Sequence, residues 1–280
     1  MGPYAAGLAA LQRGDYATAL QLWRALADQG DAEAQLGLGA MHSLGAGVAK
    51  DHAEAARWYR LAADQNNAKA QNILGTMYRS GDSIAQDYAE ALRLYQLAAN
   101  QGNANAQYNL ATMYYLGAGV AQNYAEAAKW YRLAADQGNA DAAQALGTMY
   151  SMGQGVAEDY AEAVKWYRLA ASQGNADAQW NLGIIYRMGR GVARDYVEAL
   201  QWYRLAADQG HVEAQDDLGG MYYYGLGVTQ DYVEAHMWVN LAGVGGNKDA
   251  AENRGVLESK MTSEEIAKAQ RRAAEWKRSA

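Results

Sequence analysis

The chain has 280 residues, of which 50% are hydrophobic, and this is ample apolar material for a buried core. It carries 24 Lys plus Arg against 31 Asp plus Glu, and this acidic balance of -7 argues against nucleic acid as a partner. The absence of cysteine excludes disulfides, thiolate metal sites and cysteine nucleophiles.

The first 30 residues are predicted to form an N-terminal cap. Residues 3–14 have the pattern of a shortened helix, and residues 15–30 that of a second helix in which Leu22 and Trp23 replace a later Trp-Tyr pair. The segment AAGLAAL is too short and too weakly apolar for an export signal or a membrane span. The opening Met-Gly-Pro is typical of a cloning remnant. We therefore expect a bacterial periplasmic or secreted protein if a signal peptide was removed, and a cytoplasmic one otherwise.

The rest of the chain repeats with a strict period of 36 residues. The tyrosine of a DYAEA-type phrase marks it, at Tyr16, Tyr88, Tyr124, Tyr160, Tyr196 and Tyr232, with His52 in the remaining place. A fixed period between 20 and 50 residues is typical of a solenoid, in which each unit buries its apolar face against its neighbours. We predict a single solenoid over residues 1–280, with a cap at 1–30, six repeats at 31–246 and capping helices at 247–280.

Each repeat is predicted to contain two helices, here called A and B. In residues 103–115, Ala106, Leu110 and Tyr114 recur at the helical period and predict the apolar stripe of helix A. Gly117 and Gly119 then suit the positive φ of a helix end and a turn. Residues 123–138 predict helix B. Its expected buried stripe is Tyr124, Ala127, Ala128, Tyr131, Ala134 and Ala135.

A glycine follows the helix A leucine in five repeats. These pairs are Leu38-Gly39, Leu74-Gly75, Leu146-Gly147, Leu182-Gly183 and Leu218-Gly219. Glycine inside a helix costs about 1 kcal/mol relative to alanine. Its recurrence predicts a close helix crossing at this point.

The end of the chain is predicted to close the stack. After Tyr232 the repeated phrase decays to WVNLAGVGGN, and Arg254 takes the place of the helix A leucine. Thr262 with Glu265 predicts a capping box for a last helix, and Trp276 is expected to cover the exposed end.

These motifs resemble the Sel1-like repeat, a relative of the tetratricopeptide repeat. The resemblance rests on A-x-x-x-L-G-x-x-Y-x-x-G-x-G-V, then D-Y-x-x-A, then W-Y-x-x-A-A-x-x-G. Gly-x-Gly-Val stands at residues 45–48, 117–120, 153–156, 189–192 and 225–228, and the departure is Gly-Asp-Ser-Ile at 81–84. The resemblance implies an all-α fold, a right-handed α/α superhelix (solenoid) of 36-residue helix-turn-helix repeats whose A helices line the concave face.

The resemblance also implies a function. Members are mostly adaptors, so we expect a non-catalytic scaffold that binds a protein or peptide in the concave groove. Because members are often exported or membrane-associated, a membrane-associated complex reached through a partner is compatible with this expectation. The alternative is a bacterial secretion-system immunity protein that neutralises a toxin effector. A hydrolase is the third alternative, and it requires a fixed catalytic cluster.

Motifs that carry chemistry elsewhere have structural explanations here. The Gly-x-Gly segments follow a helix and not a strand, which disfavours a dinucleotide loop. The four histidines are scattered, and the glutamates after the DY phrase suit the positive end of a helix dipole. We therefore expect no catalytic residues, no metal and no cofactor, although a Ser-His-acid triad assembled from distant residues stays open.

The binding surface is predicted where the repeats differ. At 100° per residue, positions 105, 108, 112 and 115 lie opposite the buried arc of helix A, and their equivalents vary along the chain. The residues expected to contact a partner on the concave face are Arg79, Tyr108, Thr112, Tyr115, Asp177, Trp180, Ile184, Arg187, Glu213, Asp216 and Tyr223. Aromatic residues with arginine are typical of interface hot spots. Alternatively, the tyrosines only cover the adjacent turn.

One rim of this surface is predicted to be acidic. The acidic row is Glu33, Asp141, Asp177, Glu213 and Asp249. Such a row favours a basic segment in the partner.

Overall fold

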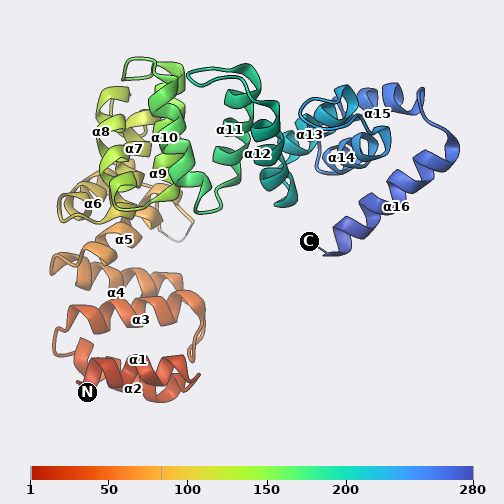
Figure 1. Cartoon of the computed structure of the whole chain (residues 1–280). Coiled ribbons are helices and arrows are strands. Elements are labelled where there is room, and N and C mark those ends of the chain that lie inside the picture. Colours follow the sequence, from red (N-terminus) through yellow and green to blue (C-terminus); the bar gives the residue numbers. More distant parts are fainter. Residues whose placement is uncertain (1, 83, 280) are drawn as a thin grey trace. The chain divides into compact units, whose positions relative to one another are not determined.

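The computed structural model describes residues 2–82 and 84–279, with side chains up to residue 277. These residues form sixteen α-helices and contain no strand. The chain divides after Asn139 into two compact units. Figure 1 shows the helices of each unit following one another as hairpins.

The first unit contains helices α1 to α8, and each helix packs against the next along the chain. Odd-numbered helices are the A helices and even-numbered ones the B helices. Their bounds are Pro3–Gln12 (α1), Tyr16–Ala27 (α2), Ala32–Leu44 (α3), His52–Asp64 (α4), Ala68–Ser80 (α5), Tyr88–Asn100 (α6), Ala104–Leu116 (α7) and Tyr124–Asp136 (α8).

The second unit continues the same pattern through α9 to α14, after which α15 and α16 both pack against α14. Their bounds are Ala140–Met152 (α9), Tyr160–Ala171 (α10), Ala176–Met188 (α11), Tyr196–Asp208 (α12), Val212–Tyr224 (α13), Tyr232–Val244 (α14), Ala250–Glu258 (α15) and Ser263–Ser279 (α16). The all-α solenoid expected from the sequence is confirmed.

The core of each repeat is built from alanine, leucine and one tyrosine. In α7, Ala106 and Leu110 are fully buried, and in α8 Ala127 and Tyr131 are buried, as the apolar stripes predict. Tyr114 and Tyr124, placed in the same stripes, are only half-buried. Small side chains let the paired helices approach closely, so burial here depends on tight contact and not on bulky residues.

The recurring helix A glycine lies at a helix crossing, as predicted. A β-carbon added at Gly147 would lie 2.8 Å from Cδ1 of Tyr167, a distance that real contacts almost never show. The same arrangement places Tyr203 2.5 Å from a β-carbon at Gly183. The tyrosine ring of helix B therefore occupies the space that a helix A side chain would need.

Buried glutamines join neighbouring repeats in both units, although Ala143 takes this position in α9. Gln107 donates from Nε2 to the carbonyl of Ala99, 3.2 Å away, and its Oε1 accepts from Nε2 of Gln137 at 2.7 Å. Gln179 and Gln209 repeat the second contact in the second unit, also at 2.7 Å. The bond to Ala99 satisfies a buried carbonyl at the end of α6, where an unpaired group costs free energy.

The last helix is held as the sequence predicts. The amide of Glu265 donates to Oγ1 of Thr262 at 3.3 Å, and the amide of Thr262 donates to the Glu265 carboxylate at 2.8 Å, which is a capping box. Trp276 of α16 lies with its ring centroid 5.9 Å from that of Trp238 in α14. Helix α16 thus packs against the B helix α14, which α15 also contacts.

Candidate functional site

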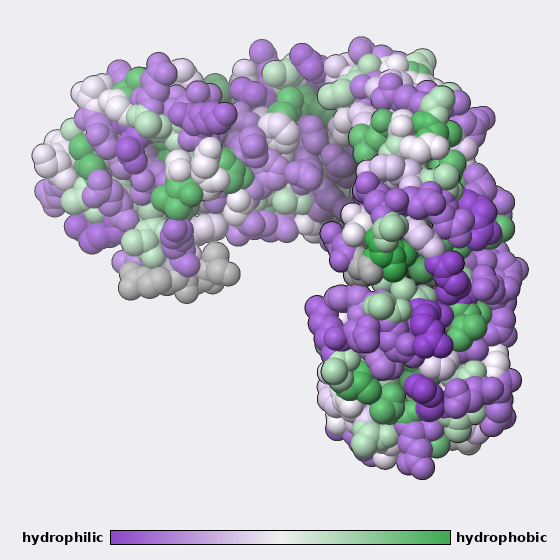
Figure 2. All heavy atoms as spheres, turned by 180° about the vertical axis from the view of Figure 1, so that it is seen from behind, coloured by the Kyte–Doolittle hydropathy of each residue, from purple (hydrophilic) through white to green (hydrophobic). Residues whose placement is uncertain are grey.

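The A-helix face is defined here as the side of each A helix that carries the residues equivalent to positions 108, 112 and 115. Of the predicted partner-binding residues, Asp177 and Glu213 are exposed and the other nine are half-buried. On the face of the molecule drawn in Figure 2, hydrophobic residues lie in separate small groups among hydrophilic ones. Hydrophobicity alone therefore marks no single surface on this face, and the candidate site is located from the contacts between its side chains.

In the first unit, the predicted residues contact a helix B tyrosine. The hydroxyl of Thr112 lies 3.0 Å from that of Tyr131 and also donates to the carbonyl of Tyr108 at 2.9 Å. The rings of Tyr108 and Tyr131 are 5.7 Å apart, and burial raises the pKa of Tyr131 to about 12. These contacts hold α7 against α8 within one repeat.

Two further predicted residues of this unit lie at the start of a loop. Tyr115 lies 5.1 Å from the ring of Tyr124, which agrees with the alternative interpretation that it covers the adjacent turn. Arg79 is half-buried, and its Nε has no hydrogen-bond partner among the described residues. The carbonyl of Arg79 accepts from Nε2 of Gln86 at 2.9 Å, so the backbone of this residue helps to hold the loop.

A row of polar contacts crosses from one A helix to the next. Nε1 of Trp180 donates to Oδ2 of Asp217 at 2.8 Å, and Nδ2 of Asn253 donates to Oδ1 of Asp216 at 3.0 Å. Both pairs are 37 residues apart, one more than the period. The helical projection did not select Asp217 and Asn253, although this spacing is visible in the sequence.

Arg187 completes a network around Asp217. It donates from Nε to the hydroxyl of Tyr203 at 3.0 Å, and its Nη2 lies 3.6 Å from Oδ1 of Asp217. Burial raises the pKa of Asp217, although the hydrogen bond from Trp180 and the charge of Arg187 act in the opposite direction. Ile184 stands one turn before Arg187, where three other repeats have threonine.

His211 connects Trp180 with the acidic rim. Its ring centroid lies 5.3 Å from that of Trp180, and its Nδ1 accepts from the amide of Ala214 at 3.2 Å, which caps α13. Because Nδ1 is an acceptor, Nε2 carries the hydrogen and donates to Asp177 at 3.0 Å. Glu213 lies 3.4 Å from Nδ1. Both rim acids chosen from the sequence therefore flank a histidine.

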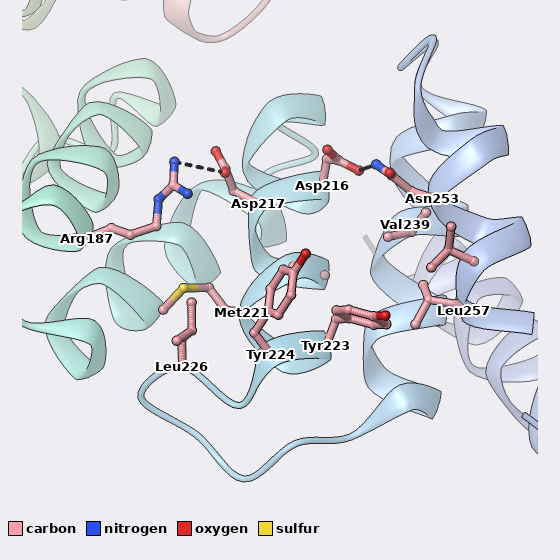
Figure 3. Close-up of a pocket in the computed structure, with 13 residues that line it drawn as sticks. Arg187, Asp216, Asp217, Met221, Tyr223, Tyr224, Leu226, Val239, Asn253 and Leu257 are labelled. Atoms are coloured by element: carbon pink, nitrogen blue, oxygen red, sulfur yellow. Dashed lines mark hydrogen bonds and ion pairs between the residues drawn. The ribbon is translucent and has the colours of Figure 1, made fainter. Parts of the chain in front are cut away.

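A pocket of about 360 Å³ opens beside this network. Figure 3 shows its polar side, with Arg187 joined to Asp217 and Asp216 joined to Asn253, above the rings of Tyr223 and Tyr224. The remaining lining residues are Gly219, Gly220, Met221, Leu226, Val239, Val256 and Leu257. Three predicted residues, Arg187, Asp216 and Tyr223, thus lie together in one pocket.

The pocket exists because this repeat has smaller residues at two positions where other repeats have larger side chains. Elsewhere a helix A threonine bonds a helix B tyrosine, as Thr148 does with Tyr167 at 3.1 Å. In the α13–α14 repeat these two positions hold Gly220 and Val239. A β-carbon added at Gly220 meets nothing within 4 Å, so the space is open.

Two further features of the described residues concern metal binding and membrane insertion. They contain no group of three or more His, Asp or Glu side chains able to hold a metal ion. None of the described helices is both long and apolar enough to cross a membrane.

Comparisons with known proteins agree with the fold. A model of the Sel1 repeat matches residues 1–31, 32–67, 68–103, 104–139, 140–175, 176–211 and 212–243. A protective antigen present in uropathogenic Escherichia coli strains, displaying an SLR fold, is 37% identical with a TM-score of 0.91 over 98% of this chain and 60% of that chain. A Sel1 repeat protein from Oxalobacter formigenes is 32% identical, with a TM-score of 0.78 over 86% and 97%. The chain spans less than two thirds of the antigen. No curated protein matches the sequence.

Proposed function

Because the chain belongs to the Sel1 repeat family, whose members are commonly protein-interaction scaffolds, we propose that it is a non-catalytic scaffold binding a protein or peptide segment on its A-helix face. The observation that carries the proposal is the pocket beside α13, which brings three of the predicted residues together. Its aromatic, apolar and charged lining has the composition of an interface hot spot.

The surroundings of the pocket support an extended partner. Large apolar side chains are exposed at the ends of three successive A helices of the second unit, at Met152, Met188 and Tyr224. Met188 and Tyr224 are equivalent residues of neighbouring repeats, so a segment lying across α11 and α13 would meet both. Methionine adapts to varied partner surfaces, and tyrosine gives a large contact area at low entropic cost.

The proposal is tested by affinity capture from the source organism with matched variants. Gly220→Thr combined with Val239→Tyr restores the pair that other repeats use and fills the pocket. We expect this variant to keep its helical signal and to lose the captured partner. The control variants Lys129→Ala and Lys165→Ala change the exposed surface of α8 and α10, and we expect them to retain it.

Other outcomes would change the assignment. A partner lost only on the control substitutions would place binding on the B helices and contradict the proposal. A captured toxin that the chain inhibits would identify the immunity alternative. Turnover of a substrate in a broad hydrolase screen would contradict the non-catalytic part.

A further inference from the structure

We propose that the pocket beside α13 receives a lysine or arginine side chain of the partner segment. The inference rests on the proposed function and adds the chemistry of one anchoring residue. It follows from the charges, the walls and the size of the pocket.

The charges of the pocket are unbalanced. The lining of the pocket holds two carboxylates, Asp216 and Asp217, and one guanidinium, that of Arg187, which pairs with Asp217. Arg187 also donates to Tyr203, and Asp216 accepts from the neutral amide of Asn253. One negative charge is therefore left in a partly enclosed space, where attraction to a cation is stronger than in bulk water.

Of the two carboxylates, Asp217 is the one that a bound cation would stabilise most. Its side chain is only 25% exposed, and burial raises its pKa despite the bond from Trp180 and the charge of Arg187. An incoming ammonium or guanidinium compensates this desolvation, whereas an incoming carboxylate adds a third negative charge. The charge pattern thus favours a basic side chain over an acidic one.

The walls suit the long stem of such a side chain. Met221, Leu226, Val239 and Leu257 give an apolar surface on one side of the pocket, and the polar groups lie on the other (Figure 3). Lysine and arginine combine an apolar stem with a charged end. The ring centroids of Tyr223 and Tyr224 are 4.7 Å apart at 90°, so one ring face and one ring edge meet at the entrance. A cation over a tyrosine face gains further attraction.

The space is a consequence of the sequence of this repeat. Gly220 and Val239 stand where Thr148 and Tyr167 fill the equivalent volume two repeats earlier. A volume of about 360 Å³ exceeds that of one long side chain, so a basic residue fits without displacement of the helices. The same replacement supplies a matched variant that closes the pocket.

The test uses the whole chain and four small probes. The probes are the N-acetyl, C-methylamide derivatives of lysine, arginine, norleucine and glutamate, titrated into 15N-labelled protein. The indole Nε1–H of Trp180 is the reporter because it bonds Asp217, and its signal is assigned by Trp180→Phe. We expect lysine and arginine probes to shift this signal with affinities at least about tenfold tighter than norleucine, which has the four-carbon stem of lysine without its ammonium group.

Two variants and one control make the result specific. The filled variant, Gly220→Thr with Val239→Tyr, and the neutral variant, Asp216→Asn with Asp217→Asn, are expected to lose at least about tenfold in lysine-probe affinity. The control Asp136→Asn removes one exposed charge from the other unit and is expected to leave the affinity unchanged.

Several results would overturn the inference. Equal affinity for lysine and norleucine probes would show an apolar pocket, preference for glutamate would show recognition through Arg187, and no response to any probe would show no side-chain site. In each case, a captured partner that still depends on the A-helix face would leave the proposed function standing. A lysine response together with a partner bound on the B helices would instead contradict the proposed function.

Discussion

Trp180 and Asp217 join two successive A helices through a 2.8 Å hydrogen bond from the indole Nε1 to the carboxylate. The bond reaches a charged and mostly buried acceptor, and such bonds contribute about 1.5 to 3 kcal/mol. We expect Trp180→Phe, which keeps a ring and removes the donor, to lower the free energy of unfolding by about 1 to 3 kcal/mol. Urea denaturation followed by circular dichroism measures the change.

Trp202 provides the matched control. Its Nε1 donates to Glu198 at 3.0 Å, four residues earlier in the same helix, and Glu198 is partly exposed. Because water replaces this bond easily, Trp202→Phe should cost less than about 1 kcal/mol. Equal losses in the free energy of unfolding for the two variants would show that the bond between α11 and α13 contributes no more to stability than a bond within one helix.

Adjacent glycines in α13 are expected to respond to alanine with opposite signs. A β-carbon at Gly219 would lie 2.7 Å from Cγ2 of Val239 and 3.1 Å from the carbonyl of Ala235, whereas one at Gly220 meets nothing within 4 Å. Overpacking costs about 1 to 3 kcal/mol, and glycine to alanine in a helix gains about 0.5 to 1 kcal/mol. Gly219→Ala should therefore destabilise the protein, and Gly220→Ala should stabilise it.

Thermal unfolding of the two variants measures this difference. Gly147→Ala is a positive control for the crossing, because its β-carbon would lie 2.8 Å from Tyr167. A stabilised Gly219→Ala variant would mean that α13 and α14 separate easily. A destabilised Gly220→Ala variant would mean that the pocket is filled in solution.

The sequence predicts the fold well because one 36-residue period places most of the core contacts. Once Leu110 is assigned to the core, its equivalents follow, and the glycine next to leucine marks the crossing with the helix B tyrosine. The limit appears at Tyr114 and Tyr124, which belong to the stripes but are half-buried. A helical projection gives the direction of a side chain and not the size of the neighbour that covers it.

A helical projection also predicts only part of the candidate site, because it does not show which neighbouring helix a side chain contacts. Thr112 points away from the core of its own helix, yet Tyr131 reaches around to bond it. Asp217 was not selected because its contact crosses between repeats, with a spacing of 37 residues. The replacement of tyrosine by Val239 was visible in the decaying phrase, but only the packing shows that it opens a pocket together with Gly220.

The pH dependence of stability should report Asp217. Burial raises the pKa of this carboxyl in the folded protein, so the folded state holds the proton more tightly than the unfolded chain. Its contribution to stability is therefore complete below the unfolded pKa and is lost as pH rises through the folded pKa. Asp217→Asn removes this loss, so the variant should gain stability relative to the wild type as pH rises from acidic values to neutrality.

Urea unfolding at a series of pH values gives the difference between the two proteins. Asparagine retains one oxygen that can accept from Trp180 and loses the ion pair with Arg187, so the comparison reports the removal of the carboxylate charge. Asp136→Asn is the control, because its exposed side chain is expected to give a difference that does not change with pH. A difference for Asp217→Asn that falls with pH would show that Arg187 more than offsets the burial.

The buried glutamines should matter more than surface glutamines. Gln107 bonds both the carbonyl of Ala99 and the side-chain amide of Gln137, and Gln107→Met removes both bonds and leaves the buried carbonyl of Ala99 without this partner. We expect a loss of about 1 to 3 kcal/mol. The control Gln96→Met removes only a bond to Asn100 on the surface of α6, and it should change stability by less than about 0.5 kcal/mol. Similar urea midpoints for the two variants would contradict the role of the buried contact.

The acidic rim should govern how fast a partner binds. The side chains of Asp177 and Glu213 are 67% and 61% exposed, so they attract a basic segment through water, and salt screens this attraction. With a partner captured on the A-helix face, Asp177→Asn and Glu213→Gln should slow association and weaken its salt dependence, with little change in dissociation.

Tyr224, which is 69% exposed beside the pocket, should act differently from the rim acids because its contact with the partner forms only in the complex. Tyr224→Ala should therefore speed dissociation by about tenfold or more, and surface plasmon resonance at several salt concentrations separates the two effects. A rim substitution that shortens the lifetime of the complex as much as Tyr224→Ala would show that Asp177 or Glu213 is part of the buried contact.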